Sequence, residues 1–399
     1  MRIIMIYLDH ASTTRVSDAA FHAMLPYLRE LYGNPGSMHH QGVQMKKAIR
    51  LSRMQIAEAI GASGEEIIFT SGGTESDNLA LVGVIDAARR EKTLKHCHII
   101  TTQIEHHAIL HPLSILEKNG VEVTYLSPRI SEGAYAEGVI DVKQVRGAIR
   151  PDTVLISVMM ANNEIGSLQQ VSQIGKLARE KNILFHTDAV AVVGHKQFCV
   201  KEMNVDLLSA SAHKFGGPQG CGFLYVRKNI PFSPLMYGGG QERGLRPGTP
   251  NVAGIVSMAA ALTESLRDVE SKQERVAMLR DKLADGLSKI PGSRINGVYD
   301  STMRLEGNLN MSFELVQSES LLMMLDQRQI CVSAGSACTA SENKGSHVLK
   351  SLGYLDTQAE GTIRFSLGAE NTDNEIAQTI QAVTECVNEL RSIRLKEFS

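Results

Sequence analysis

The sequence predicts an α/β fold with a mainly parallel, seven-stranded sheet, and two observations carry this prediction. Between about residues 66 and 226, short apolar runs alternate with helical stretches. The composition, with 43% hydrophobic and 21% charged residues in a chain of 399, is globular and sufficient for more than one core. Such alternation is typical of a parallel sheet covered on both faces by helices. Seven strands are expected, at residues 66–70, 98–102, 121–126, 153–161, 183–189, 206–211 and 222–226.

Helices and a second domain are expected around this sheet. Helices are predicted over 17–31, where Ser17 is a cap, over 41–60, from Thr74, from His106 and near 170–181. After the helix-rich stretch 252–289, a smaller α+β domain follows. Its strands are expected at 294–298, 308–313, 330–335 and 362–368, and its helices near 318–328, 346–352 and 373–396. The division is a large domain of residues 16–260 and a small domain of residues 1–15 and 261–399.

Composition excludes several classes of protein. A formal net charge of −2 gives no basic footprint for nucleic acid, and no apolar run is long enough for a signal peptide or a membrane span. We therefore expect a cytoplasmic protein. The six cysteines are scattered, which favours reduced thiols over a disulfide framework. His107 and His111 have the spacing of two zinc ligands, but no third ligand follows, so no metal is expected.

Residues 205–222 place a lysine where a strand ends. Val205, Leu207 and Leu208 predict a short buried strand, and small residues follow it before Lys214 and a glycine-rich turn. Burial lowers the pKa of a lysine, and a neutral amine is what Schiff-base chemistry with an aldehyde cofactor requires. A structural lysine at a strand end is the commoner case, so the partners of Lys214 decide between the two interpretations.

The stretch FTSGGTESDN, residues 69–78, predicts a phosphate site. A strand ends there, Gly72 and Gly73 turn the chain, and Thr74 begins a helix whose first N–H groups are free to bind an anion. The same letters also fit an ordinary capped turn, with Thr74 as N-cap and Asp77 in the first helical turn.

Two further side chains follow buried strands. Asp188 needs a cationic or donor partner at that depth, and the protonated ring nitrogen of pyridoxal phosphate would be one. A helix cap or a structural arginine is an equal alternative. His106 can stack on a flat cofactor and carry protons, although a lone histidine is more often structural.

Two candidates lie near the C-terminus. Cys338 stands among small and polar residues in the expected loop 333–345, where a thiol remains accessible for attack. Arg364 interrupts an apolar strand, and its rigid fork matches the carboxylate of an amino acid. An internal ion pair is the alternative for Arg364.

Eleven motifs together, in this order, carry a resemblance to a known family. They run nearly end to end: YLDHASTT, GNPGS, FTSGGTESDN, EHHAIL, ANNEIG, HTDAV, SASAHKFGGP, GGGQERGLRPGT, GSACTAS, SHVL and IRFSLG. The chain resembles the cysteine desulfurases of the NifS/IscS type, which depend on pyridoxal 5′-phosphate and belong to the class V aminotransferases. The resemblance implies the fold of type I pyridoxal phosphate enzymes.

The resemblance also implies the cofactor contacts. Lys214 would bind the cofactor covalently and move a proton, Asp188 would pair with the ring nitrogen, and His106 would stack on the ring. The remaining cofactor contacts would be Gly73, Thr74, Ser211 and His213 near the phosphate, Asn162 at the ring oxygen, and Thr249 at the phosphate of the neighbouring subunit in a homodimer.

The implied substrate is L-cysteine. Asn34 and Arg364 would hold its carboxylate, and Cys338 would take its sulfur as a persulfide, leaving L-alanine. The sulfur would then pass to an acceptor such as an iron–sulfur scaffold protein. One departure stands out, because the family usually has a glutamine at the position of Ala191. That side chain donates a hydrogen bond to the ring oxygen, so its loss predicts altered protonation at the lysine–cofactor bond and a slower enzyme.

Two rival functions remain at this stage. A selenocysteine lyase or another β-eliminating enzyme could use the same scaffold with less dependence on Cys338. A non-catalytic homologue could serve as a docking scaffold for sulfur-transfer partners, as the loss at Ala191 suggests. The presence together of Lys214, Asp188, His106 and Cys338 argues against it.

Overall fold

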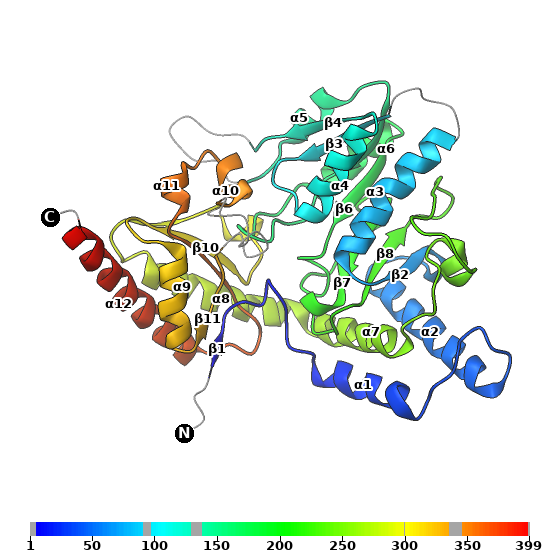
Figure 1. Cartoon of the computed structure of the whole chain (residues 1–399), viewed down its shortest axis with the longest axis horizontal. Coiled ribbons are helices and arrows are strands. Elements are labelled where there is room, and N and C mark those ends of the chain that lie inside the picture. The colour runs from blue at the N-terminus through cyan, green and yellow to red at the C-terminus, as the bar shows by residue number, and fades with distance from the viewer. Residues whose placement is uncertain (1–4, 91–96, 129–137, 299, 335–344, 398–399) are drawn as a thin grey trace.

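The computed structural model of the chain describes residues 5–90, 97–128, 138–298, 300–334 and 345–397, and its largest element is a seven-stranded sheet (Figure 1). Only β8 runs against its neighbours, and the other six strands are parallel to one another. The predicted, mainly parallel sheet is therefore confirmed. In spatial order the strands are β2 (Ile67–Thr70), β8 (Gly222–Val226), β7 (Leu207–Ser211), β6 (Leu184–Asp188), β5 (Thr153–Ser157), β3 (Cys97–Thr102) and β4 (Val121–Leu126).

Helices cover both faces of this sheet, as its apolar strands require. One face packs against α3 (Gly73–Arg90) and α4 (His107–Lys118). The opposite core is formed by α2 (His40–Ala59), α5 (Val142–Ala148), α6 (Val171–Glu180) and α7 (Val252–Leu266), while α1 (Asp18–Arg29) lies against α7. Short 3-10 turns are η1 (Gly64–Glu66), η2 (Ala212–Lys214), η3 (Gln241–Gly244) and η4 (Ser301–Met303).

A second, separate core lies in the C-terminal part of the chain. An antiparallel sheet of β12 (Thr362–Ser366), β10 (Asn308–Phe313) and β9 (Ser293–Ile295) forms one layer, and β1 (Ile6–Tyr7) pairs in parallel with β11 (Ile330–Cys331). The helices are α8 (Val269–Leu287), α9 (Ser318–Gln327), α10 (His347–Ser351), α11 (Asp356–Ala359) and α12 (Asp373–Glu397). Among the described helices, none combines the length and the apolar character needed to cross a membrane.

Some element ends differ from the sequence prediction. The strand expected over 153–161 ends at Ser157. Val158 and Met160 still donate hydrogen bonds to carbonyls of β6, but β3 pairs with β5 only as far as Ile156, so the continuation is bonded on one side. The boundary expected between residues 260 and 261 falls inside α7, whose Leu262 belongs to the core of the large domain. We propose that the domains divide after Leu266 instead.

The crossing segment, residues 9–17, joins the two domains. At one end, the N–H of His10 donates to the carbonyl of Ser366 in β12 at 3.2 Å. At the other end, the N–H of Thr14 donates to the carbonyl of His213 at 2.8 Å, and the N–H of Ser17 donates to the carbonyl of Gly216 at 2.9 Å. This segment therefore fixes β12 relative to the turn that carries Lys214.

Candidate active site

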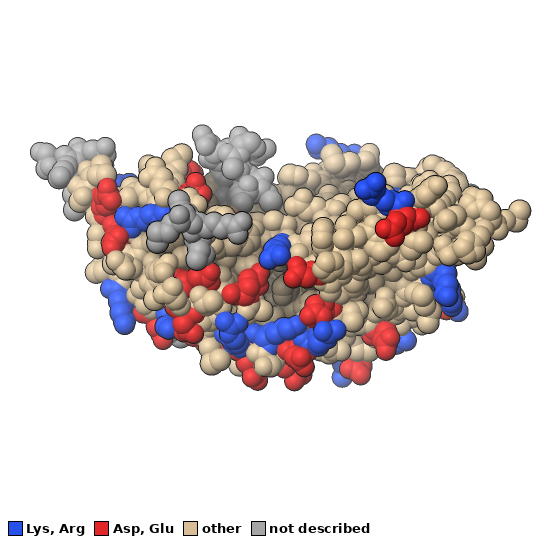
Figure 2. Space-filling model, turned by 90° about the horizontal axis from the view of Figure 1, so that it is seen from below, with Lys and Arg blue, Asp and Glu red and all other residues tan. Residues whose placement is uncertain are grey.

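A cavity of about 820 Å³ opens where the parallel strands of the large sheet reach their carboxyl ends, next to the small domain. Ligands collect at this edge of open α/β sheets. Acidic and basic side chains gather around a hollow near the middle of one face of the molecule (Figure 2). Most of the predicted site residues line the cavity, namely Gly73, Thr74, His106, Asp188, Ser211, His213, Lys214 and Arg364.

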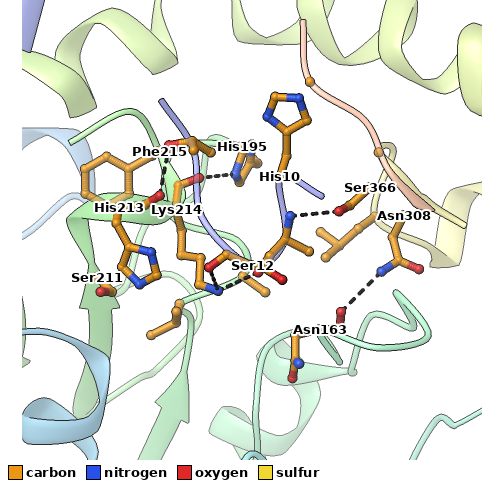
Figure 3. Close-up of a pocket in the computed structure, with 18 of the residues that line it drawn as sticks. His10, Ser12, Asn163, His195, Ser211, His213, Lys214, Phe215, Asn308 and Ser366 are labelled. Carbon is orange, nitrogen blue, oxygen red and sulfur yellow. Dashed lines mark hydrogen bonds between the residues drawn. The ribbon is translucent and has the colours of Figure 1, made fainter. Parts of the chain in front are cut away.

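Lys214 ends η2, directly after β7 (Figure 3). Its Nζ donates hydrogen bonds to the carbonyls of Ala11 and Ser12, the latter at 3.0 Å, so the crossing segment holds the amine. The backbone is fixed as well, because Nε2 of His195 donates to the carbonyl of Lys214 at 2.9 Å. Gly216, with a φ of +83°, turns the chain immediately afterwards. The amine is thus directed at the cavity by contacts from two domains.

Asp188 is the last residue of β6 and is 6% exposed. Burial raises the pKa of its carboxyl to about 6. Two groups act in the opposite direction and lower this pKa, namely the N–H of Val190, which donates to the carboxylate at 2.9 Å, and the charge of Lys214. A buried carboxyl with only this support would be stabilised in its ionised form by a cationic N–H group in the cavity. The protonated nitrogen of a pyridine ring fits that requirement.

His106 caps the N-terminus of α4. Its Nδ1 accepts a hydrogen bond from the N–H of Ala108 at 3.1 Å, which leaves Nε2 as the nitrogen that carries the proton. Burial, followed by the charge of Lys214, lowers the pKa of His106 to about 4. The ring is therefore neutral at pH 7 and can both stack on a flat group and exchange a proton.

The start of α3 forms another wall of the cavity. An added Cβ on Gly73 would lie 2.7 Å from Cγ2 of Val190, so only glycine fits without a shift. Ser211 and His213 line the same cavity from the end of β7, where burial and the charge of Lys214 lower the pKa of His213 to about 4. Free N–H groups of a first helical turn, with a hydroxyl and a neutral imidazole nearby, suit a phosphate.

Arg364 of β12 points its guanidinium at the cavity, with its side chain 4% exposed. Its Nη2 contacts Asp9 at 3.0 Å and the hydroxyl of Ser12 at 2.7 Å, while Nη1 donates to the carbonyl of Asn163 at 3.1 Å. Nε has no hydrogen-bond partner among the described residues. The internal ion pair, one of the two alternatives from the sequence, is therefore present, and Nε is left as a buried donor. The contact of Arg364 with a substrate carboxylate stays a prediction.

Three predicted site residues do not join this group. Asn162 is fully buried, and its amide is already used. Its Nδ2 donates to the carbonyl of Ile104 at 2.8 Å, and its Oδ1 accepts from the N–H groups of Glu164 and Ile165. The expected contact of Asn162 with a ring oxygen therefore does not fit this geometry, because the side chain shapes the turn instead. Its neighbours Asn163 and Glu164 line the cavity.

The other two residues, Asn34 and Thr249, lie outside the cavity lining. A fourth predicted site residue, Cys338, lies outside the described residues. Asn34 is exposed, and its Oδ1 accepts from the N–H of Gly36 at 2.9 Å. Thr249 is exposed as well, and its contact with a second subunit stays a prediction.

Three buried acids also line this cavity, Asp77, Glu105 and Glu164. The sequence did not indicate Glu105 and Glu164 as site residues, and it indicated Asp77 only as an acid in the first turn of a helix. Burial raises the pKa of Glu105 to about 8 and that of Glu164 to about 7. The available signal was the position of each acid inside a polar motif next to a buried strand, as in EHHAIL and ANNEIG. Among the residues that the structure describes, no group of three or more His, Cys, Asp or Glu side chains could hold a metal ion.

The fold and this cavity define an α/β enzyme of the type I pyridoxal phosphate architecture. The chain belongs to the aminotransferase class-V family, which it matches over residues 6–379. This is a family of pyridoxal-phosphate-dependent enzymes.

Its relatives include proteins named cysteine desulfurase IscS. That of Methanosarcina thermophila is 45% identical over 97% of this chain and 93% of its own length. That of Haemophilus influenzae is 44% identical over 97% of this chain and 94% of its own length. A solved NifS-like protein superposes with a TM-score of 0.87 at 35% identity, covering 96% of this chain and all of that one. A structure of SspA in complex with cysteine superposes with a TM-score of 0.80 at 35% identity, covering 92% of this chain and all of that one.

Proposed function

We propose that this chain is a cysteine desulfurase that removes sulfur from L-cysteine, releases L-alanine and carries the sulfur as a persulfide on Cys338. One observation supports this most directly. A single cavity contains a lysine amine, a buried carboxyl, a neutral histidine and an arginine with a free buried donor. Relatives that are 45% and 44% identical to this chain are named cysteine desulfurase.

The cofactor that we propose is pyridoxal 5′-phosphate, and the residues present fit it. Its phosphate would lie at the start of α3 with Gly73, Thr74, Ser211 and His213, and its ring nitrogen would face Asp188. When bound, the group supplies an electron-withdrawing ring that makes the Cα proton of an amino acid acidic. Ala191 lines the cavity and offers no donor to the ring.

Side chains of the cavity would orient the substrate and transfer protons. Arg364 would orient the substrate carboxylate through its free Nε, with Asp9 and Ser12 fixing its fork. Lys214, released from the two carbonyls of the crossing segment, would move the Cα proton. His106 would return a proton from its neutral ring. Asn34 retains a proposed role at the substrate carboxylate, although within one chain it does not line the cavity.

Cys338 would be the nucleophile. Its thiolate would attack the sulfur of the substrate, forming an S–S bond while the Cβ–S bond breaks. The electron pair of the broken bond would remain with Cβ, which takes up a proton to give L-alanine. The terminal sulfur of the persulfide would then pass to an acceptor thiol, such as one on an iron–sulfur scaffold protein.

We also propose a homodimer that works in the cytoplasm. Exposed apolar side chains on α1, among them Phe21, Leu25 and Leu28, support a subunit interface. The exposed position of Thr249 supports its reach to a second subunit. The described cysteines are free thiols, as a reducing compartment favours.

The experiment is alanine release from L-cysteine by the pyridoxal-phosphate-loaded protein, beside Cys338→Ala and the control Cys199→Ala. We expect alanine from the parent and the control and none from Cys338→Ala. Equal release from all three proteins would favour a lyase that needs no thiol, as for a selenocysteine substrate. Cofactor binding without alanine from any protein would favour a non-catalytic scaffold.

A further inference from the structure

A strip of polar side chains lies at the large sheet and reaches the wall of the cavity. It consists of Ser157 on β5, His186 and Asp188 on β6, and Ser209 on β7, with Asp77 of α3 above them. All five are at most 6% exposed. Strands covered on both faces are normally apolar, and a buried polar group costs free energy unless it is hydrogen-bonded. The strip therefore requires a chemical reason.

Its members face one another because of the strand register. His186 precedes Asp188 by two residues, so both side chains leave the same face of β6. Ser157 pairs with His186, and Ser209 pairs with Asp188. The imidazole of His186 lies between the two hydroxyls, with Nδ1 2.9 Å from Ser157 and Nε2 3.0 Å from Ser209. Oδ1 of Asp77 is 3.6 Å from Nε2 of His186 and has no hydrogen-bond partner among the described residues.

This arrangement provides no cation for Asp77. Burial lowers the pKa of His186 to about 3, so the ring between the two serines is neutral. Burial raises the pKa of Asp77 well above its ordinary range, and the charges of Asp188 and Glu105 add to this, opposed only by the nearby Ser209 hydroxyl.

Asp188 has better support for a negative charge. The N–H of Val190 and the charge of Lys214 both favour its ionised form. Two buried carboxyls that interact cannot both ionise easily, and the one with a donor and a cation ionises first.

We propose that Asp77 is a positioning residue that stays protonated at the wall of the cavity, so that Asp188 carries the single negative charge presented to the cofactor. This inference rests on the proposed function, because it assigns Asp188 to the ring nitrogen of pyridoxal phosphate. A second anion at Asp77 would divide the attraction for the ring proton between two carboxylates. The neutral His186–Ser157–Ser209 network leaves the charge at the end of β6.

The test is a pH titration of the aspartate side-chain ¹³C signals, with and without pyridoxal 5′-phosphate. The proteins are the wild type, Asp77→Asn, Asp188→Asn and the control Asp285→Asn, whose exposed carboxyl lies outside the cavity lining and whose replacement should remove only its own signal. In the cofactor-free wild type, we expect the Asp188 signal to titrate at the lower pH and the Asp77 signal to titrate at a much higher pH. In Asp188→Asn the Asp77 signal should titrate lower by about one pH unit or more, since the neighbouring charge is gone. In Asp77→Asn the Asp188 signal should stay within a few tenths of a pH unit.

Binding of the cofactor should lower the pH at which the Asp77 signal titrates, as Asp188→Asn does, because a cationic ring nitrogen neutralises the charge of Asp188. Three results would overturn the proposal. In the first, the Asp77 signal titrates in the ordinary carboxylate range. In the second, the pH at which the Asp188 signal titrates falls by more than one unit in Asp77→Asn. In the third, neither Asp188→Asn nor the cofactor changes the pH at which the Asp77 signal titrates. If the wild type binds no pyridoxal 5′-phosphate by absorbance, the proposed function fails, while the cofactor-free titration still decides the order of ionisation.

Discussion

Replacing Glu105 by glutamine should make the stability of the cofactor-free protein less dependent on pH. Glu105 is fully buried at the end of β3. Its Oε1 accepts from the hydroxyl of Thr102 at 2.8 Å and from the N–H of Met159 at 3.0 Å, and its Oε2 has no partner among the described residues. Burial, only partly opposed by these two donors, raises the pKa from 4.5 to about 8. Glutamine keeps the accepting oxygen and replaces an unpartnered O–H by an unpartnered NH2 group.

The sign follows from the raised pKa. The folded state binds the proton of Glu105 more tightly than the unfolded state, so folding stability is lost as the pH rises from 4.5 through 8. The cost is about 1 kcal/mol at pH 5 and on the order of 4 kcal/mol at pH 8. Relative to the wild type, Glu105→Gln should therefore gain on the order of 3 kcal/mol in free energy of unfolding between pH 5 and pH 8.

Urea denaturation at both pH values measures this difference. Glu58→Gln is the matched control, because Glu58 is exposed on α2 and its replacement should be nearly neutral at both pH values. A difference between Glu105→Gln and the wild type that is the same at pH 5 and pH 8 would refute the reasoning. It would mean that the carboxyl keeps one protonation state across this range or titrates alike in both states.

Three further predictions concern the site. Ala191→Gln should restore a donor worth about 1.5–3 kcal/mol and tighten pyridoxal 5′-phosphate binding by about tenfold or more in equilibrium dialysis, whereas Ala191→Met, of similar size, should not. An equal effect of both would show that volume matters and not the donor. Arg364→Lys should raise KM for L-cysteine by about tenfold or more, with a smaller change in kcat, because a lysine has one amine and cannot replace both the Nε donor and the fork that Asp9 and Ser12 fix; an unchanged KM would place the carboxylate elsewhere. Gly73→Ala should weaken cofactor binding, because its Cβ would lie 2.7 Å from the side chain of Val190, while Gly147→Ala meets nothing within 4 Å and should bind normally.

The sequence predicted the strands of the large sheet, because hydrophobic periodicity carries that information. It also named candidate residues that line one cavity, and the roles of these residues remain predictions. Lys214, Asp188 and His106 each follow an apolar run, and the carboxyl ends of parallel strands meet at one edge. The role of Asn162 could not be read in this way. The Nδ2 group of Asn162 donates to the carbonyl of Ile104, which is far away in the sequence, so only the folded structure shows this contact. Glu105 was missed for a similar reason, since it appears in the sequence as an ordinary polar residue.

The pairing of β1 with β11 means that β1 can form its ladder only after β11 has been synthesised. Ile6 has its parallel partner at Ile330, so the first strand waits unpaired until most of the chain has left the ribosome. The large sheet, by contrast, has all its strands by Val226. The crossing segment that holds the Lys214 amine and orients Arg364 is anchored in β12, one of the last strands to be made. The cavity can therefore be completed only after β12 has been synthesised, when every strand of the large sheet is already available.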